Sequence, residues 1–401
     1  MANIGQYTII EELGHGSYST VFHAVHSALG NQVVIKLLSQ NLSNNEIARK
    51  RFSDEAQIAA SLSHPNILPI LDLDEDNGQF FIIMEFVSGS DLNKLCRAKK
   101  IFTPKEIIHI LKQSASALDY AHSKNIFHKD IKPSNILIDP NGDVHLCDFG
   151  LVGVAAAAKL NTVGNASYIS PEQVEGKTID GRSDQYSLGI VAFELLTGEL
   201  PFKGDSTTAI ALMQLTRQPP LPTSINPQLS LEVSNIIIKA LEKDPANRYT
   251  NCTEFINVLS AAMEDSQISN FKSLLSEAKS LLSSGEIDKS RIKIELARKI
   301  QIERPDLIED LSELDLTHKA SEEYSEIVSS WKNANEEARK VLDIFPDFPD
   351  NEGVFEFLGL RKNEWAKPSP KEIVSQVFLG ILIGLPVFSL ILYFTFKWIT
   401  R

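Results

Sequence analysis

Two short stretches predict the architecture: His128-Lys129-Asp130-Ile131-Lys132-Pro133-Ser134-Asn135 and, thirteen residues after Asn135, Asp148-Phe149-Gly150. Between them, the apolar run Ile136–Ile138 predicts a short buried strand. Asn141-Gly142 then predicts a tight turn into a second strand, Val144–Leu146. A hairpin of this kind would place the polar residues of both stretches at one edge of a cleft.

Three of these polar residues have the chemistry of a phosphoryl-transfer site. Asp130 and Asp148 supply carboxylates, and Asn135 supplies an amide. Transfer from ATP needs one carboxylate to accept the proton of the acceptor hydroxyl, and oxygen ligands that hold Mg²⁺ on the phosphates. The spacing of the two stretches favours this chemistry over a chance hairpin with polar ends.

The pattern resembles the catalytic loop and metal-binding turn of the bacterial Hanks-type (eukaryotic-like) serine/threonine protein kinases. The resemblance implies that Asp130 positions and deprotonates the acceptor. It implies that Lys132 offsets charge on the γ-phosphate and marks specificity for serine and threonine. Asn135 and Asp148 would bind Mg²⁺, with Mn²⁺ as the alternative ion.

The N-terminal part matches the nucleotide loop of that family. Tyr7–Leu13 predicts a strand, and Gly14 and Gly16 allow a hairpin whose backbone N–H groups approach phosphates. Ser19 stands where the third glycine of the family's loop is usual. The resemblance implies that the nucleotide is contacted by Leu13, Gly14, His15, Gly16, Ser17, Tyr18, Ser19, Thr20 and Val21.

The next strand, Val33–Lys36, ends on a lysine that matches the family's anchor for the α- and β-phosphates. The helix predicted from Ile47 to Leu62 would supply the carboxylate that orients it. We choose Glu55, because the family's glutamate lies three residues after an aromatic residue, as Glu55 does after Phe52. The neighbouring Asp54 is the alternative, and a solvated position explains it better.

The adenine site is expected where the resemblance places the hinge between two lobes. Phe80–Met84 predicts a buried strand, and Glu85-Phe86-Val87 follows it. Adenine would bond to the backbone C=O of Glu85 and to both backbone groups of Val87. Met84 would be the gatekeeper, Val34 the roof of the site, and Leu137 its floor.

A capped helix is predicted from Thr103-Pro104-Lys105-Glu106 through Tyr120.

Later residues match structural anchors of the family. Asp184 would fix the backbone of the catalytic loop. The resemblance implies that residues 151–169 form the activation segment, which closes at Ser170-Pro171-Glu172, where Arg248 would pair with Glu172.

Two further positions depart from the family's pattern. Lys129 replaces an arginine and lacks its bidentate fork, and Asn165 stands where a threonine would contact the catalytic loop. Both departures affect how phosphorylation would control activity and how the acceptor peptide would be bound.

The composition is that of an ordinary globular protein, with 43% hydrophobic and 23% charged residues among 401. The formal net charge of −13 argues against nucleic acid as a partner. Three cysteines without CxxC spacing indicate a reducing compartment. Cys147, beside the expected nucleotide pocket, is interpreted as a small buried core residue. The first residues have no features of a secretory signal.

Beyond Met263 the kinase pattern ends and a polar helical sequence begins. Ala297-Arg298-Lys299-Ile300 has a counterpart 41 residues later in Ala338-Arg339-Lys340-Val341. Degenerate tetratricopeptide-like repeats are one interpretation, and unrelated amphipathic helices are equally compatible.

The segment Val377–Phe396 contains twenty uncharged, mostly apolar residues, which is the length of a transmembrane helix. Four basic residues precede it and two follow it, which favours a cytoplasmic N-terminal body. Gly380 and Gly384 form a GxxxG motif that would allow two such helices to dimerise.

The sequence therefore predicts an α+β, bilobal protein kinase fold with a β-rich N-lobe and a helical C-lobe at residues 1–265. A helical juxtamembrane region at 266–372, a transmembrane helix at 373–397 and a short tail at 398–401 would follow. The expected function is ATP-dependent serine/threonine kinase activity on protein substrates, with autophosphorylation, at the cell membrane. The alternative is a pseudokinase scaffold that recruits partners through its helical region.

Overall fold

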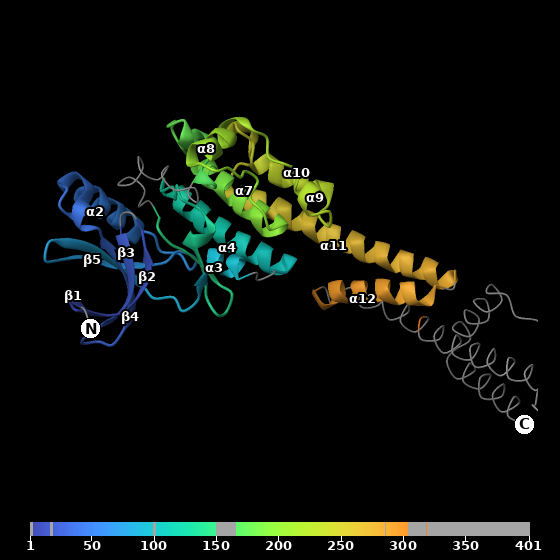
Figure 1. Ribbon diagram of the computed structural model, residues 1–401, viewed down its shortest axis with the longest axis horizontal. Coiled ribbons are helices and arrows are strands. Elements are labelled where there is room, and N and C mark those ends of the chain that lie inside the picture. Colours follow the sequence, from blue (N-terminus) through green and yellow to red (C-terminus); the bar gives the residue numbers. More distant parts are fainter. Residues whose placement is uncertain are drawn as a thin grey trace, which may run out of the picture. The chain divides into compact units, whose positions relative to one another are not determined.

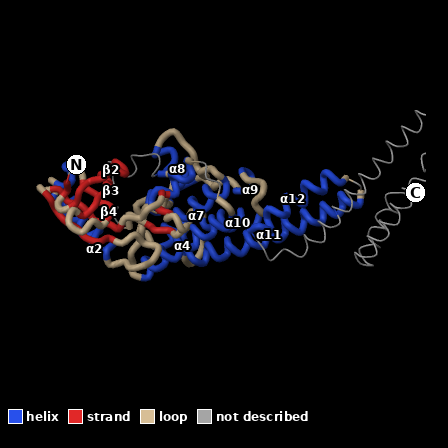
Figure 2. The backbone as a smooth tube through the Cα atoms, turned by 90° about the horizontal axis from the view of Figure 1, so that it is seen from below, coloured by secondary structure: helices blue, strands red, loops and turns tan. Residues whose placement is uncertain are grey.

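The computed structural model describes residues 3–16, 19–98, 102–149, 166–284, 286–303 and 318, apart from the side chains of Arg51, Glu55, Ser283 and Glu303. The chain divides into two compact units, Met1–Ser266 and Gln267–Arg401. The first unit itself has a strand-rich N-terminal lobe and a helical lobe (Figures 1 and 2).

The N-terminal lobe is an antiparallel sheet with two helices (Figure 1). In the order β1-β2-β3-β4-β6-β5, its strands are Asn3–Ile4, Tyr7–His15, Ser19–His26, Gln32–Leu38, Gln79–Glu85 and Ile70–Asp76. The helices α1 (Gln40–Ser43) and α2 (Glu46–Ala60) lie between β4 and β5 in sequence.

Alternation along the central strands divides the apolar side chains of this sheet between two clusters. Val33 and Ile35 of β4 belong to one buried cluster, which also contains Tyr7 and Phe81. Val34, between them, belongs to the other cluster, which contains residues of α2 and β6. Because successive side chains of a strand point to opposite faces, one face of the sheet carries α2 and the predicted adenine-site residues together.

The helical lobe begins with a small sheet of β7 (Ser90–Asp91), β8 (Ile136–Ile138) and β9 (Val144–Leu146). Its helices surround α7 (Gly181–Thr197), most of whose residues are buried. The others, with two 3₁₀ helices, are α3 (Leu92–Arg97), α4 (Pro104–Ser123), η1 (Pro133–Asn135), α6 (Pro171–Val174), α8 (Thr207–Thr216), α9 (Pro222–Ile225), α10 (Leu231–Ala240) and η3 (Pro245–Asn247). The helix α11 (Cys252–Ser283) begins in this unit.

Local signals in the sequence place several of these elements correctly. The predicted hairpin is confirmed: Ile136 pairs with Leu146, and Ile138 with Val144. The capping box of α4 is also confirmed, since Thr103 and Glu106 exchange hydrogen bonds between side chain and backbone. α4 runs to Ser123, beyond the predicted end at Tyr120, because apolar positions continue to Ala121, which is fully buried. α2 starts and ends within two residues of its predicted bounds.

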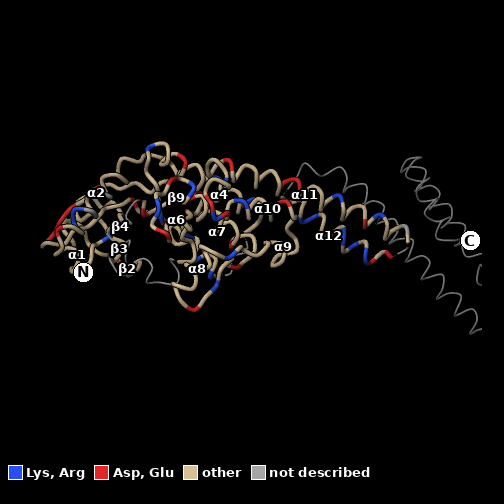
Figure 3. Tube along the Cα trace, turned by 90° about the horizontal axis from the view of Figure 1, so that it is seen from above, with Lys and Arg blue, Asp and Glu red and all other residues tan. Residues whose placement is uncertain are grey.

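In the second unit, the C-terminal part of α11 and the helix α12 (Ile287–Glu303) share an apolar cluster that includes Phe271, Ala278 and Ile294. Both helices carry charged residues of both signs (Figure 3), and Lys293 of α12 pairs with Glu277 of α11 at 2.6 Å. None of the helices among the described residues combines the length and the apolar character that crossing a membrane requires. The predicted span at 373–397 and the second predicted repeat lie outside the described residues.

Candidate active site

Asp130 is held by two neighbours on its own loop. Lys132 Nζ lies 2.9 Å from Asp130 Oδ2, and Asn135 Nδ2 donates to the same oxygen at 3.1 Å. Asn135 Nδ2 also donates to the backbone oxygen of Asp130 at 2.8 Å. A cation and an amide therefore orient this carboxylate before a substrate arrives, which is the preorganisation that proton transfer and charge stabilisation require.

The backbone of this loop is strained, and α7 holds it in place. Lys129 has a φ of +66°, in the left-handed region that costs a non-glycine residue about 1–2 kcal/mol. Asp184, buried on α7, accepts the backbone N–H of His128 at 2.8 Å and that of Lys129 at 2.7 Å. The anchoring role predicted for Asp184 is confirmed.

The ring of His128 joins the loop to the turn that carries Asp148. Its Nε2 lies 2.9 Å from the backbone oxygen of Cys147, and its Nδ1 accepts the backbone N–H of Asp130 at 3.3 Å. Both bonds require a neutral ring with the proton on Nε2. The ring is fully buried and contacts Phe149, and burial lowers the pKa of His128. The buried environment thus favours the required protonation state.

Lys36 and Asp148 connect the two lobes. Lys36 Nζ, on β4, lies 2.6 Å from Asp148 Oδ1, just after β9. Asp148 has a φ of +67°, which asparagine and aspartate tolerate better than other non-glycine residues. Glu55 lies on α2, but its side chain is outside the described part of the structure, so the predicted pair of Lys36 and Glu55 stays a prediction.

Asn135 and Asp148 lie at the same end of the hairpin. The backbone oxygen of Asn135 accepts the N–H of Cys147 at 3.1 Å, directly before Asp148. Because Asn135 Nδ2 is committed to Asp130, Oδ1 is the amide atom that could bind a metal ion. An amide oxygen and a carboxylate are hard ligands that suit Mg²⁺ or Mn²⁺. The pair fits a divalent cation.

The predicted adenine-site residues come together on one apolar surface. Val34, Val87 and Leu137 all pack, partly buried, against the cluster that contains Met84. Cys147 packs against the same cluster and is itself partly buried. Burial raises the pKa of its thiol well above the ordinary value, so it stays protonated at neutral pH and contributes as an apolar group. Glu85 ends β6 and donates its N–H to the oxygen of Pro69 at 3.1 Å.

The predicted phosphate loop is the hairpin between β2 and β3. Gly14 pairs with Val21, and His15 with Thr20, and the N–H of Gly16 bonds to the oxygen of Ser19 at 2.9 Å. Leu13 is 39% exposed on β2, so it is available to a ligand. Two of the predicted contact residues, Ser17 and Tyr18, lie outside the described residues.

A small cavity of about 10 Å³, enough for roughly one water molecule, lies beside Met84 and Asp148. Both the gatekeeper position and the metal-binding turn therefore contribute to its wall. Its other lining residues are Ala59, Ile67, Leu68, Ile70, Leu146 and Phe149.

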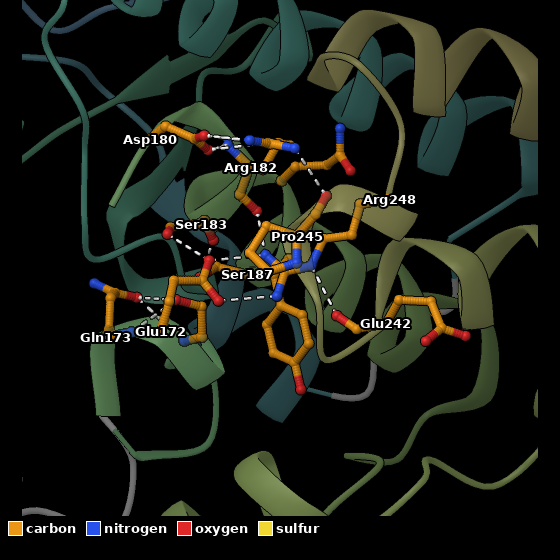
Figure 4. Close-up of polar contacts among 12 residues, drawn as sticks. Glu172, Gln173, Asp180, Arg182, Ser183, Ser187, Glu242, Pro245 and Arg248 are labelled. Atoms are coloured by element: carbon orange, nitrogen blue, oxygen red, sulfur yellow. Dashed lines mark hydrogen bonds and ion pairs between the residues drawn. The ribbon is translucent and has the colours of Figure 1, made fainter. Parts of the chain in front are cut away.

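A buried ion pair joins α6 to the residue that follows η3 (Figure 4). Arg248 Nη1 and Nη2 donate to Glu172 Oε1 at 2.8 Å and Oε2 at 2.9 Å, which confirms the predicted pair. Ser183 donates to the same carboxylate at 2.5 Å. Burial alone would raise the pKa of Glu172, but hydrogen bonds and charge from Arg248 outweigh it and lower that pKa.

His122 extends the anchor of the catalytic loop to α11. Its Nε2 lies 2.8 Å from Asp184 Oδ2, and its Nδ1 lies 3.7 Å from Asp119 Oδ1. Asp119 also accepts the backbone N–H groups of Cys252 and Thr253. Asp119, His122 and Cys252 are residue types that can bind a metal ion. The bonds just described already account for them, because Asp119 caps the start of α11 and, with Asp184, pairs with the charged imidazole of His122.

The charge of His122 gives the fold a predictable pH dependence. Burial alone would lower the pKa of His122, but Asp119 and Asp184 outweigh it and raise the pKa to about 9, from 6.5. Because the pKa of His122 is higher in the folded chain than in the unfolded chain, its charged form stabilises the fold. This contribution is complete below about pH 6.5 and is lost as the pH rises through 9. We expect the free energy of unfolding to fall by about 2–3 kcal/mol from pH 6.5 to 9.5.

Calorimetric unfolding of the full chain at several pH values measures this loss. The His122→Gln variant cannot titrate at this position, so it should be less stable at pH 6.5 and much less sensitive to alkaline pH. If the variant and the parent chain lose stability in parallel, another group carries the effect.

No role for His122, His128 or Gln173 is predicted from the sequence. His122 is bonded to Asp184, which anchors the catalytic loop, and His128 and Gln173 bond to the backbone of the loop itself. Their partners lie in distant segments, apart from the short-range bond of His128 to Asp130. The one available signal was the histidine itself within the stretch 128–135. Of the predicted catalytic residues, Lys132 lies beside Asp130 and Lys36 beside Asp148.

A two-lobed fold with an Asp130 loop and a bridging Lys36–Asp148 pair is the architecture of the protein kinases. A family model for the protein kinase domain matches residues 7–260, and the chain belongs to this family. The kinase domain of PknI from Mycobacterium tuberculosis is a similar solved structure, with 28% sequence identity and a TM-score of 0.54. That comparison covers 65% of this chain and 98% of the PknI domain.

Two curated relatives are bacterial serine/threonine kinases. The probable serine/threonine-protein kinase PknB of Lactococcus lactis is 41% identical over 256 residues, which is 63% of this chain and 41% of that protein. The serine/threonine-protein kinase PrkC of Bacillus subtilis is 41% identical over 249 residues, 61% of this chain and 38% of its own. The match thus spans about two-fifths of the length of these relatives.

Proposed function

We propose that this protein is a serine/threonine protein kinase that transfers the γ-phosphoryl group of ATP to protein hydroxyls. The observation that carries the proposal is the preorganised Asp130, bonded to Lys132 and Asn135, at the end of the hairpin that also carries Asp148. The names of the bacterial relatives support serine and threonine as acceptors.

The residues have distinct roles in this reaction. Asp130 accepts the proton of the attacking hydroxyl and orients its oxygen toward the γ-phosphorus. Lys132, bonded to Asp130, offsets charge on the γ-phosphate, and Lys36 holds the α- and β-phosphates. Asn135 and Asp148 would hold Mg²⁺, which when bound neutralises charge on the phosphate oxygens.

The direct experiment incubates the purified full chain with radioactive ATP, Mg²⁺ and a generic acceptor protein. We expect label on serine and threonine of the acceptor. The alternative, a pseudokinase scaffold, is favoured only by Lys129 and Asn165, which depart from the family's pattern. If the chain binds ATP but transfers no phosphate, whichever divalent metal ion is supplied, the result would support the scaffold.

Autophosphorylation belongs to the same proposal. The sequence between Gly150 and Asn165 lies outside the described residues, and it contains Thr162. We propose that a second copy modifies Thr162 or neighbouring hydroxyls first, because this is the segment that another copy's active site could most readily accept. Since Lys129 lacks an arginine fork, the gain in activity should be modest.

We also propose a membrane location, with Val377–Phe396 as a single span and the kinase domain in the cytoplasm. This rests on the twenty uncharged residues of that segment and on the basic residues before it. Gly380 and Gly384 would let two spans approach closely and raise the local concentration of kinase domains.

A paired substitution tests this dimer. Gly380→Ile combined with Gly384→Ile should reduce crosslinking in membranes several-fold and slow autophosphorylation at low protein density. Leu382→Ile, an apolar exchange between the two glycines, is the matched control and should change neither. Equal crosslinking in all three chains would show that the glycines only fill the helix.

A further inference from the structure

Gln173 connects the end of the activation segment to the catalytic loop. It is the third residue of α6, which follows that segment, and its side chain makes two kinds of bond. Oε1 accepts the backbone N–H of Ser170 at 3.1 Å and the hydroxyl of Ser170 at 3.0 Å. Nε2 donates to the backbone oxygen of Lys129 at 2.9 Å. Figure 4 shows Gln173 beside Glu172, the carboxylate that Arg248 holds.

The chemistry of its partners fixes the orientation of this amide. The backbone N–H of Ser170 can only donate, and the backbone oxygen of Lys129 can only accept. The oxygen of Gln173 must therefore face Ser170, and its nitrogen must face Lys129. A capping box is satisfied by either glutamate or glutamine, but only glutamine can cap α6 and also donate to the catalytic loop.

The bond to Lys129 is made at the most constrained point of the loop. The peptide group between Lys129 and Asp130 is held at both ends, because Gln173 binds its oxygen and His128 Nδ1 binds its N–H at 3.3 Å. The preceding N–H of Lys129 is bound by Asp184 at 2.7 Å. With a φ of +66° at Lys129, this backbone would relax if one of these bonds were lost.

We propose that Gln173 is a positioning residue for Asp130, and that it makes the geometry of the catalytic loop depend on the docking of the activation segment's C-terminal end. The inference rests on the proposed kinase function. Rotation of the Lys129–Asp130 peptide would turn the Asp130 carboxylate away from Lys132 and Asn135, since its Cα belongs to that peptide unit. The link uses a neutral amide and a backbone oxygen, so it operates without phosphorylation and without the charge of Lys129.

Gln173→Glu isolates this role, because it keeps the size of the side chain and the acceptor that caps α6. It replaces the donor to Lys129 by a carboxylate oxygen that faces another oxygen. We expect kcat to fall roughly 5- to 50-fold, while the KM for ATP changes less than about twofold. The thermal midpoint should stay close to that of the parent chain.

Ser170→Ala is the matched control, because it removes the hydroxyl from the same cap but leaves the Gln173–Lys129 bond in place. It should lower the thermal midpoint, as the loss of an N-cap does, and leave kcat within about twofold. The two variants therefore separate the positioning of Asp130 from the stability of α6. Equal losses of kcat in both variants, or a parental kcat in Gln173→Glu, would overturn the inference.

Hydrogen exchange followed by mass spectrometry gives a readout that does not need activity. In Gln173→Glu, the peptide that contains Lys129 and Asp130 should exchange faster, and in Ser170→Ala it should not. If the parent chain transfers no phosphate, the proposed function fails, and exchange still tests the bond to the loop. Unchanged exchange in Gln173→Glu would then remove the inference on its own.

Discussion

Replacing Asp148 by asparagine should abolish phosphoryl transfer while the kinase domain stays folded. The change removes the carboxylate that faces Lys36 at 2.6 Å and that would hold the metal ion. Asparagine is the suitable replacement because, like aspartate, it tolerates the left-handed backbone found here, at φ +67°. We expect kcat to fall by several powers of ten from a typical kinase value of roughly 1–100 s⁻¹.

Lys36→Met should have a similar effect, because it removes the cation on the other side of this pair. Asp205→Asn is the matched control for Asp148→Asn, since Asp205 is an exposed loop residue and its replacement removes the same negative charge. Radioactive transfer and thermal unfolding should be measured on all of these chains. Undiminished transfer in Asp148→Asn or Lys36→Met would remove the kinase assignment, whereas an unfolded variant would only move the test to the other one.

The sequence was sufficient where a local pattern determines local structure. The hairpin of β8 and β9 and the capped start of α4 follow from turn and cap residues that act within a few positions. The resemblance to a family added the long-range pairs, Arg248 with Glu172 and Asp184 with the catalytic loop, which spacing alone could not supply.

Residues that couple distant segments carry no such signal. Gln173 and Lys129 are 44 positions apart, and His122 and Asp184 are 62 apart. A glutamine after Pro171-Glu172 has the appearance of an ordinary capping residue, and its second bond exists only after the loop is folded against α6. The left-handed backbone at Lys129 and Asp148 was also hidden, because neither residue is glycine and the strain depends on partners elsewhere.

Among the described residues, the buried ion pair of Glu172 and Arg248 should contribute more to stability than any exposed ion pair. Its side chains are only 5% and 0% exposed, so neither charge can regain water if the other is lost. Arg248 also donates to the backbone oxygens of Glu242, Arg182 and Lys243. Its removal therefore takes a cationic donor from the Glu172 carboxylate, to which Ser183 still donates, and takes one donor from each of three carbonyl groups.

We expect Glu172→Gln to lower the free energy of unfolding by about 3–5 kcal/mol, and Arg248→Met to lower it further. The control is Glu199→Gln, which breaks an exposed pair with Lys203 at 2.7 Å and should cost less than about 1 kcal/mol. Calorimetry of the single variants and of the double variant Glu172→Gln/Arg248→Met measures the coupling, and the double variant should lose less than the sum of the two. If Glu172→Gln lowers the free energy of unfolding no more than Glu199→Gln does, the burial of this pair does not govern its contribution to stability. Its role at the end of the activation segment would then have to be tested by kinase activity.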